Sequence, residues 1–154
     1  MQQQNPAGPM RLEQYDTVVK LMRGKADSPA NIAAKKVLVQ GMKTLDAIQE
    51  SGIQRDSVYK AIKRYSSAHE RIVKVFQGDG GIGAQFDLIV DLNRGNAEAP
   101  TTKAARAVIV DGMANSEIDR TDITPQGLYE AVKRYRNAID DIVKAYPHED
   151  AGGN

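Results

Sequence analysis

Apolar residues recur at intervals of three and four along most of the chain, which is the spacing of one face of an α-helix. The first such stripe is formed by Leu12, Tyr15, Val18, Val19 and Met22. A second helix is expected to begin near Pro29, a residue suited to the first helical turn, and to end before Gly41. The β-branched runs VLV and VIV lie within helical patterns, so no strand is predicted.

A short helix, a tight turn and a long helix follow. The short helix is expected over about Lys43–Glu50, and Ser51, Gly52 and Ile53 form the turn. The apolar stripe of the long helix consists of Val58, Ile62, Tyr65, Ile72 and Phe76. A short helix, a turn of three or four residues containing glycine and a longer helix are together the helix-turn-helix pattern.

The whole pattern occurs twice. Residues 15–29 match residues 86–100 at an offset of 71, and the match continues from 33–42 to 104–113. The second copy then lacks one residue, so that "VYKAIKRY" matches "LYEAVKRY" at an offset of 70. The chain is therefore interpreted as a tandem duplication.

The second copy repeats the helical signals of the first. Thr124 and Pro125 form a strong start signal for its long helix, a capping hydroxyl followed by proline at the first helical position. Its apolar stripe consists of Leu128, Val132, Tyr135, Ile139, Ile142 and Tyr146. The predicted fold class is all-α, with two tandem helix-turn-helix domains of about four helices each.

The expected organisation follows from the repeat and from a glycine-rich segment between the copies. The predicted parts are a disordered tail (1–10), an N-terminal helix-turn-helix domain (11–76), a linker (77–84), a C-terminal helix-turn-helix domain (85–147) and a second disordered tail (148–154).

Net charge separates the two copies. Residues 11–77 contain 13 Lys and Arg against 7 Asp and Glu, a net +6, whereas residues 78–154 contain 8 against 13, a net −5. A basic half beside an acidic half of similar sequence suggests that the two copies have different partners.

The composition excludes several kinds of site. The chain has no cysteine, so thiolate metal sites and cysteine nucleophiles are impossible. His69 and His148 lack partners at metal-ligand spacing and are expected on the surface, and the glycines of residues 77–84 do not form a phosphate-binding motif. No catalytic residue, metal or cofactor is predicted, and the chain is not expected to be an enzyme. No membrane span or signal peptide is found, which favours a cytoplasmic location.

The chemistry expected of the motif is DNA recognition. The second helix of such a motif enters the major groove, where Arg and Gln contact base edges and Lys contacts phosphates. The candidate residues of the first copy are Gln54, Arg55, Ser57, Tyr59, Lys60, Lys63 and Arg64. Those of the second copy are Thr124, Gln126, Tyr129, Lys133 and Arg134.

Two stretches carry a resemblance to a known family. The segment "AAKKVLVQGMKTLDAIQESGIQRDSVYKAIKRY", and with one deletion "AARAVIVDGMANSEIDRTDITPQGLYEAVKRY", resembles the plasmid transcriptional repressors of the KorA/TrfB type. The resemblance implies a dimeric repressor of plasmid, phage or other mobile-element genes that binds palindromic operators through residues 54–65 and 124–135. It also places Arg55 and Arg64 where the family has basic residues.

The chain departs from that family in several ways. The family has one such domain followed by a separate dimerisation segment, whereas here there are two copies and no obvious extra segment. Asp122 replaces the turn glycine in the second copy, and Ile48 and Ile118 occupy positions where small residues are common.

Three alternatives remain open at this stage. Both copies could read one imperfect palindrome as a covalent pseudo-dimer. Alternatively, the basic copy could bind DNA while the acidic copy mediates self-association or partner binding, which the charge difference favours. A helical adaptor, or an architectural DNA-binding protein for plasmid maintenance, is the alternative function. In that case the repeated "KRY" segments would be solvated helix faces around the core residues Tyr65 and Tyr135.

Overall fold

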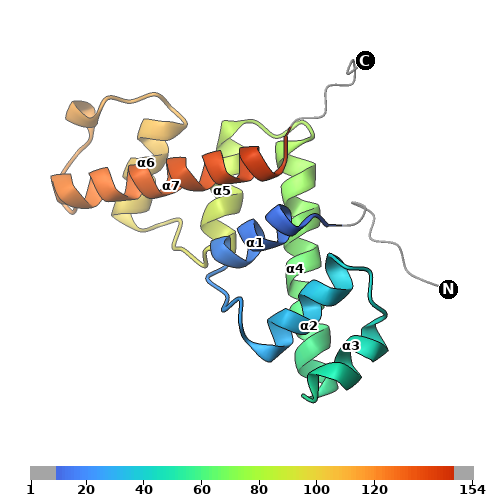
Figure 1. The fold of residues 1–154 in the computed structure, drawn as a ribbon. Helices are drawn as coiled ribbons and strands as arrows, with labels where there is room; N and C mark the ends of the chain where they lie inside the picture. The colour runs from blue at the N-terminus through green and yellow to red at the C-terminus, as the bar shows by residue number, and fades with distance from the viewer. Residues whose placement is uncertain (1–9, 148–154) are drawn as a thin grey trace, which may run out of the picture. The chain divides into compact units, whose positions relative to one another are not determined.

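The computed structural model describes residues 10–147, and within that range the chain is helical with no strand. The helices are α1 (Leu12–Leu21), α2 (Pro29–Leu38), α3 (Thr44–Ser51), α4 (Arg55–Phe76), α5 (Ile82–Leu92), α6 (Pro100–Ile109), the short 3-10 helix η1 (Asn115–Glu117) and α7 (Pro125–Ala145) (Figure 1). The prediction of an all-α fold is confirmed.

The chain divides into two compact units, unit 1 up to Val73 and unit 2 from Lys74 onward. The division falls within the last turn of α4. Residues 82–84, assigned to the linker from the sequence, form the first turn of α5. The expected tails lie outside the described residues except for Met10, which is buried and donates its backbone N–H to the Leu38 carbonyl over 3.2 Å.

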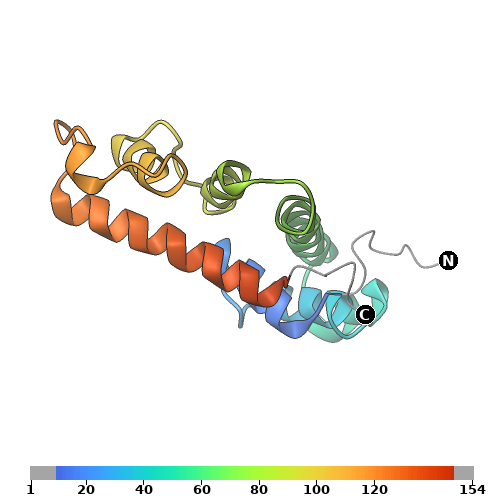
Figure 2. The same ribbon diagram turned by 90° about the horizontal axis from the view of Figure 1, so that it is seen from above.

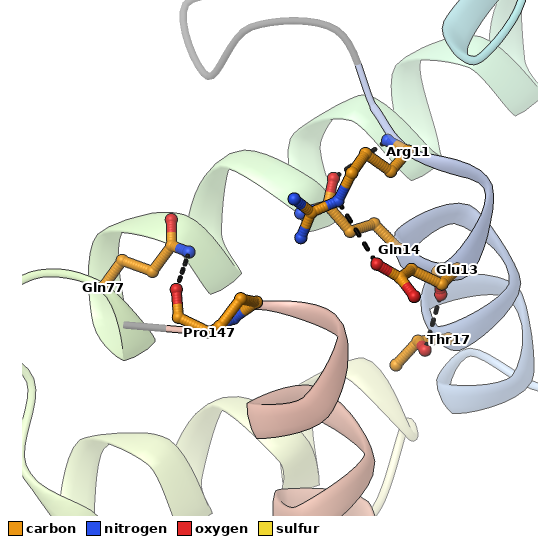
Figure 3. Close-up of polar contacts among 6 residues, drawn as sticks. All are labelled: Arg11, Glu13, Gln14, Thr17, Gln77 and Pro147. Carbon is orange, nitrogen blue, oxygen red and sulfur yellow. Dashed lines mark hydrogen bonds and ion pairs between the residues drawn. The ribbon is translucent and has the colours of Figure 1, made fainter. Parts of the chain in front are cut away.

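Local sequence sets the start of the first two helices. The Arg11 backbone N–H donates to the Gln14 side chain over 3.0 Å at the beginning of α1 (Figure 3). At α2, the Ser28 hydroxyl accepts the Asn31 backbone N–H over 3.2 Å, and Pro29 occupies the first helical position. Such capping bonds satisfy N–H groups that have no partner within the helix.

Two tyrosines form the centre of unit 1. The Tyr15 and Tyr65 rings meet edge to face with centroids 5.6 Å apart, a favourable arrangement for aromatic pairs. The Tyr15 hydroxyl donates to the Asn31 carbonyl over 2.6 Å, and burial, followed by the proximity of Tyr65, raises the Tyr15 pKa above its ordinary value. The Tyr65 hydroxyl is also buried but has no hydrogen-bond partner among the residues that the structure describes.

This difference predicts opposite effects of removing the two hydroxyls. Tyr15→Phe deletes a buried hydrogen bond and should lower the free energy of unfolding by about 1 kcal/mol or somewhat more. Tyr65→Phe removes a polar group without a described partner and should be neutral or stabilising. Urea unfolding of the two variants, followed by circular dichroism, measures both values; an equal loss in both would contradict the assignment.

Unit 2 contains a corresponding aromatic pair, Phe86 and Tyr135, with ring centroids 4.7 Å apart. The long helix α7 packs on α6 and α5, as both ribbon views show (Figures 1 and 2). Arg106 of α6 donates to both carboxylate oxygens of Asp87 of α5, over 2.9 and 3.3 Å. Pro147 lies just after the end of α7, and its carbonyl accepts a hydrogen bond from the side chain of Gln77, which follows α4, over 2.9 Å (Figure 3).

The two copies differ between their second and last helices. Unit 1 has the expected eight-residue helix α3, but unit 2 has only the three-residue η1, followed by an irregular segment up to Thr124. The prediction of tandem helix-turn-helix domains with about four helices each is therefore not confirmed, because the second copy lacks the first helix of the motif.

The prediction for His69 was also wrong. The side chain is only 1% exposed and lies on the buried side of α4 with Ala68 and Ile72. The position falls on the apolar stripe of that helix, so the spacing alone could have placed it inside. His148 lies outside the described residues.

Candidate nucleic-acid interface

The segment of unit 1 predicted as a helix-turn-helix comprises α3, the turn at Gly52 and α4. Gly52 adopts a left-handed backbone with φ of 71°, a conformation that glycine enters without steric cost. The Ser51 hydroxyl donates to the Ile48 carbonyl over 2.8 Å and accepts the Ile53 N–H over 3.2 Å. These contacts fix the turn and therefore the angle at which α4 leaves it.

A small apolar cluster holds the motif against α2. Its buried residues come one from each of the three helices: Ala33 from α2, Ala47 from α3 and Val58 from α4. The partly buried residues around them are Val37, Met42, Ile48, Ile53 and Ile62. Ile48, noted in the sequence as unusual for the motif, thus packs at the edge of the cluster. Lys36 of α2 and Glu50 of α3 add an ion pair between the same helices.

The first half of α4 presents a polar face opposite this cluster. Val58, Ala61 and Tyr65 are buried on one side. At 3.6 residues per turn, Lys60 and Lys63 lie on the opposite side. All seven residues predicted for the first copy are exposed, namely Gln54, Arg55, Ser57, Tyr59, Lys60, Lys63 and Arg64. Within α4, Lys60 and Lys63 share the side opposite the buried residues, whereas Arg55 and Arg64, nine residues apart, lie on opposite flanks of the exposed half of the helix.

Arg64 differs from its neighbours because it also contacts the core. Its guanidinium carbon lies 5.7 Å from the centroid of the Tyr65 ring, within cation–π range. In unit 2, the equivalent Arg134 lies 5.0 Å from the centroid of the Tyr135 ring. The repeated arginine before each core tyrosine thus has a structural contact, which is enough to explain why this part of the "KRY" segment occurs twice.

The exposed face of α7 carries a different set of groups. The five residues predicted for the second copy, Thr124, Gln126, Tyr129, Lys133 and Arg134, are all exposed. However, the Thr124 hydroxyl accepts the Gly127 N–H over 2.9 Å, so it caps the helix. The Gln126 side chain donates over 2.7 Å to Glu130, which occupies the position of Lys60. A carboxylate at the centre of this face opposes an approaching phosphate.

The segment before α7 is also acidic and folds onto itself. Asp119 accepts bonds from the Thr121 backbone N–H and hydroxyl over 3.0 and 2.5 Å, and these bonds lower the Asp119 pKa, with the hydroxyl contributing most. The Glu117 side chain accepts the Ala114 N–H over 2.9 Å. Such local bonds from Asp side chains compete with helix formation. The second copy, which is one residue shorter here, has only the three-residue η1 at the position of α3.

Two residues of the α4 face, Asp56 and Ser67, were not among those predicted from the sequence. Ser67 is exposed and lies one helical turn beyond Lys63 on the same side. Helical spacing alone would have identified it. Asp56 also lies on this face, one turn before Lys60, and is its acidic member.

Within residues 10–147, no group of three or more His, Asp or Glu side chains could hold a metal ion. None of the helices described is both long and apolar enough to cross a membrane. Comparisons of the chain with models of protein families, with curated proteins and with solved structures found no match.

Proposed function

We propose that the chain is a sequence-specific double-stranded DNA-binding protein that uses one helix-turn-helix, that of unit 1. The start of α4 would enter the major groove, with Gln54 and Arg55 at the base edges and Lys60 and Lys63 near the phosphates. The KorA/TrfB resemblance supports a more specific role as a transcriptional repressor of bacterial mobile-element genes.

The observation that carries this proposal is the contrast between two related helices in one chain. Residues 43–64 contain five basic and three acidic side chains, whereas the equivalent residues 114–134 contain three basic and four acidic ones. The basic version alone is preceded by a complete α3 and a glycine turn. Charge and backbone therefore agree in favouring unit 1 as the reader of DNA.

One reading helix per chain has a consequence for the operator. A palindromic operator has two equivalent half-sites about one helical turn apart, so two chains would be needed to occupy it. In this proposal unit 2 supports association of the two chains. The three-residue η1 at the position of α3 is the reason that this arrangement is preferred to a covalent pseudo-dimer.

The proposal is tested by the salt dependence of DNA binding. Fluorescence anisotropy of the full chain with labelled random-sequence duplexes should show binding at low ionic strength. The affinity should then fall steeply between about 50 and 200 mM salt, because each phosphate contact releases counterions. A labelled acidic polypeptide with a net charge similar to that of the duplex serves as the control, since it measures attraction to any polyanion.

Absence of duplex binding at low salt would overturn the proposal. The adaptor function would then be the better account, with the exposed apolar side chains Tyr129 and Val143 of α7 as its protein-binding residues.

A further inference from the structure

Two arginines, one in each unit, have an unusual backbone conformation. Arg23 and Arg94 both have φ of 58°, and within residues 10–147 no other residue except glycine has a positive φ. The left-handed region costs roughly 1 kcal/mol or more for a residue with a Cβ atom. The same cost is present in both copies of the repeat.

The conformation arises from the way that α1 and α5 end. Arg23 donates its backbone N–H to the Lys20 carbonyl over 3.0 Å, and Gly24 donates to the Val19 carbonyl over 2.8 Å. Arg94 and Gly95 make the corresponding bonds to Asp91 and Val90 over 3.0 and 2.8 Å. This is the Schellman motif, in which the left-handed position usually holds glycine.

The glycine next to each arginine lies near the core tyrosine, much more closely in unit 1 than in unit 2. A Cβ atom at Gly24 would lie 2.4 Å from the Tyr65 hydroxyl, and one at Gly95 would lie 3.3 Å from Val90 and 3.6 Å from the Tyr135 hydroxyl. Glycine is therefore used where the loop approaches the core tyrosine. The arginine has no such explanation, since glycine would fit its position with less strain.

No contact within the described residues accounts for either arginine. Both side chains are exposed, and neither makes a hydrogen bond or ion pair with any residue from 10 to 147. Four of the neighbouring residues differ between "LMRGKADSP" and "LNRGNAEAP", but both arginines are present. The backbone of each arginine takes part in the helix cap, but its exposed guanidinium has no partner among residues 10–147. A strained position whose side chain has no internal partner points to a ligand.

The position relative to the core tyrosine indicates which ligand. The Tyr65 ring connects the two sites: Arg64 lies against it, and Gly24 adjoins its hydroxyl. Arg23 therefore precedes the glycine at the hydroxyl end of the ring against which Arg64 lies. Tyr135 makes the corresponding connection between Arg134 and Gly95. An exposed guanidinium presents several N–H donors to phosphate oxygens.

We propose that Arg23 and Arg94 each bind a phosphate of the DNA backbone, so that unit 2 contacts DNA without reading its sequence. This inference rests on the proposed function and extends it to a second contact, in the unit that lacks a helix-turn-helix. The left-handed backbone fixes the direction in which each side chain leaves the main chain, and both side chains are exposed.

Arg→Gly variants test the proposal because they remove the charge while relieving the strained backbone. In the full chain, Arg23→Gly and Arg94→Gly should each weaken duplex binding several-fold and reduce the slope of log affinity against log salt by about 1. The melting temperature should stay the same or rise. Arg23→Lys, which keeps the charge, should retain most of the affinity, and Arg23→Gln, which keeps only the length, should not.

The outcomes separate this inference from the function on which it rests. If the wild-type chain binds duplexes but both glycine variants keep its affinity and salt slope, the phosphate contacts are refuted and the proposed function stands. An effect of Arg23→Gly alone would overturn the assignment to unit 2. Failure of the wild-type chain to bind at any salt concentration would refute both proposals.

Discussion

Reversing two charges on α4 should abolish specific DNA binding. In the double variant Lys60→Glu/Lys63→Glu, carboxylates replace ammonium groups at the centre of the exposed face. α7 already has a carboxylate, that of Glu130, at the position equivalent to Lys60. Two phosphate contacts would be lost and replaced by repulsion, so affinity should fall by roughly two orders of magnitude near 0.1 M salt. Anisotropy titrations with a labelled duplex to which the wild-type chain binds measure this loss of affinity.

The repeat supplies a matched control for this experiment. Lys63 and Lys133 are equivalent positions, both exposed on the outer side of a long helix. Lys63→Glu should therefore weaken binding at least tenfold, whereas Lys133→Glu should change it by less than about threefold. Equal large losses for the two single variants would favour the covalent pseudo-dimer over a single reading unit. Neither lysine is buried, so the melting temperature should hardly change in any of these variants.

Adding one methyl group at Gly24 should destabilise unit 1 strongly. The Cβ of Gly24→Ala would lie 2.4 Å from the Tyr65 hydroxyl and 3.2 Å from Val19. The Tyr65 ring is fully buried and packed against Tyr15, so it cannot move aside without disturbing the core. Overpacking of this kind typically costs about 1–3 kcal/mol, which corresponds to a fall in melting temperature of several degrees for a unit of this size.

The equivalent glycine of unit 2 again provides the control. A Cβ at Gly95 would have nothing closer than 3.3 Å, and neither glycine has a left-handed φ, so Gly95→Ala should cost much less than Gly24→Ala. In a Tyr65→Phe background the cost of Gly24→Ala should fall substantially, since the clashing oxygen is absent. Urea unfolding of the single and double variants measures this coupling. Similar stabilities for Gly24→Ala and Gly95→Ala would show that the contact with Tyr65 is not restrictive.

Much of the helical architecture could be predicted from the sequence because its signals are local. The start of α2 at Pro29 and that of α7 at Pro125, with Ser28 and Thr124 as caps, follow from residues that satisfy the first N–H groups of a helix. The end of α3 at Gly52 follows from the left-handed turn that glycine allows. Most of the buried positions followed from spacing alone, but Leu12, predicted on the first stripe, is 48% exposed.

The loss of α3 in the second copy could not be predicted in the same way. The second copy lacks one residue between Met113 and Leu128, and the similarity of the two copies on either side gave no sign that this deletion removes a helix. In the structure, the segment forms local bonds around Asp119 instead of a helix packed on α6 and α7. Similarity of sequence indicated a common origin of the copies, but a short helix depends on tertiary packing that one deletion can remove.

The arginines at the ends of α1 and α5 were also invisible to sequence reasoning. "RG" after a helix looks like an ordinary stop signal, and either residue could occupy the left-handed position. The hydrogen bonds at the end of α1 place Arg23 in the left-handed position, and the close approach to Tyr65 accounts for the glycine that follows it. The candidate contacts on α4, by contrast, were accessible from helical spacing, since they are the residues between its apolar positions.

Selection of bound sequences from a random pool of duplexes tests most directly whether unit 1 alone reads DNA. The selection should be run with the wild-type chain, with Lys60→Glu/Lys63→Glu and with Lys133→Glu. The wild-type chain and Lys133→Glu are expected to enrich the same motif, and the α4 variant to enrich none. A motif that changes or disappears with Lys133→Glu would contradict this account, since it would mean that α7 also reads the sequence.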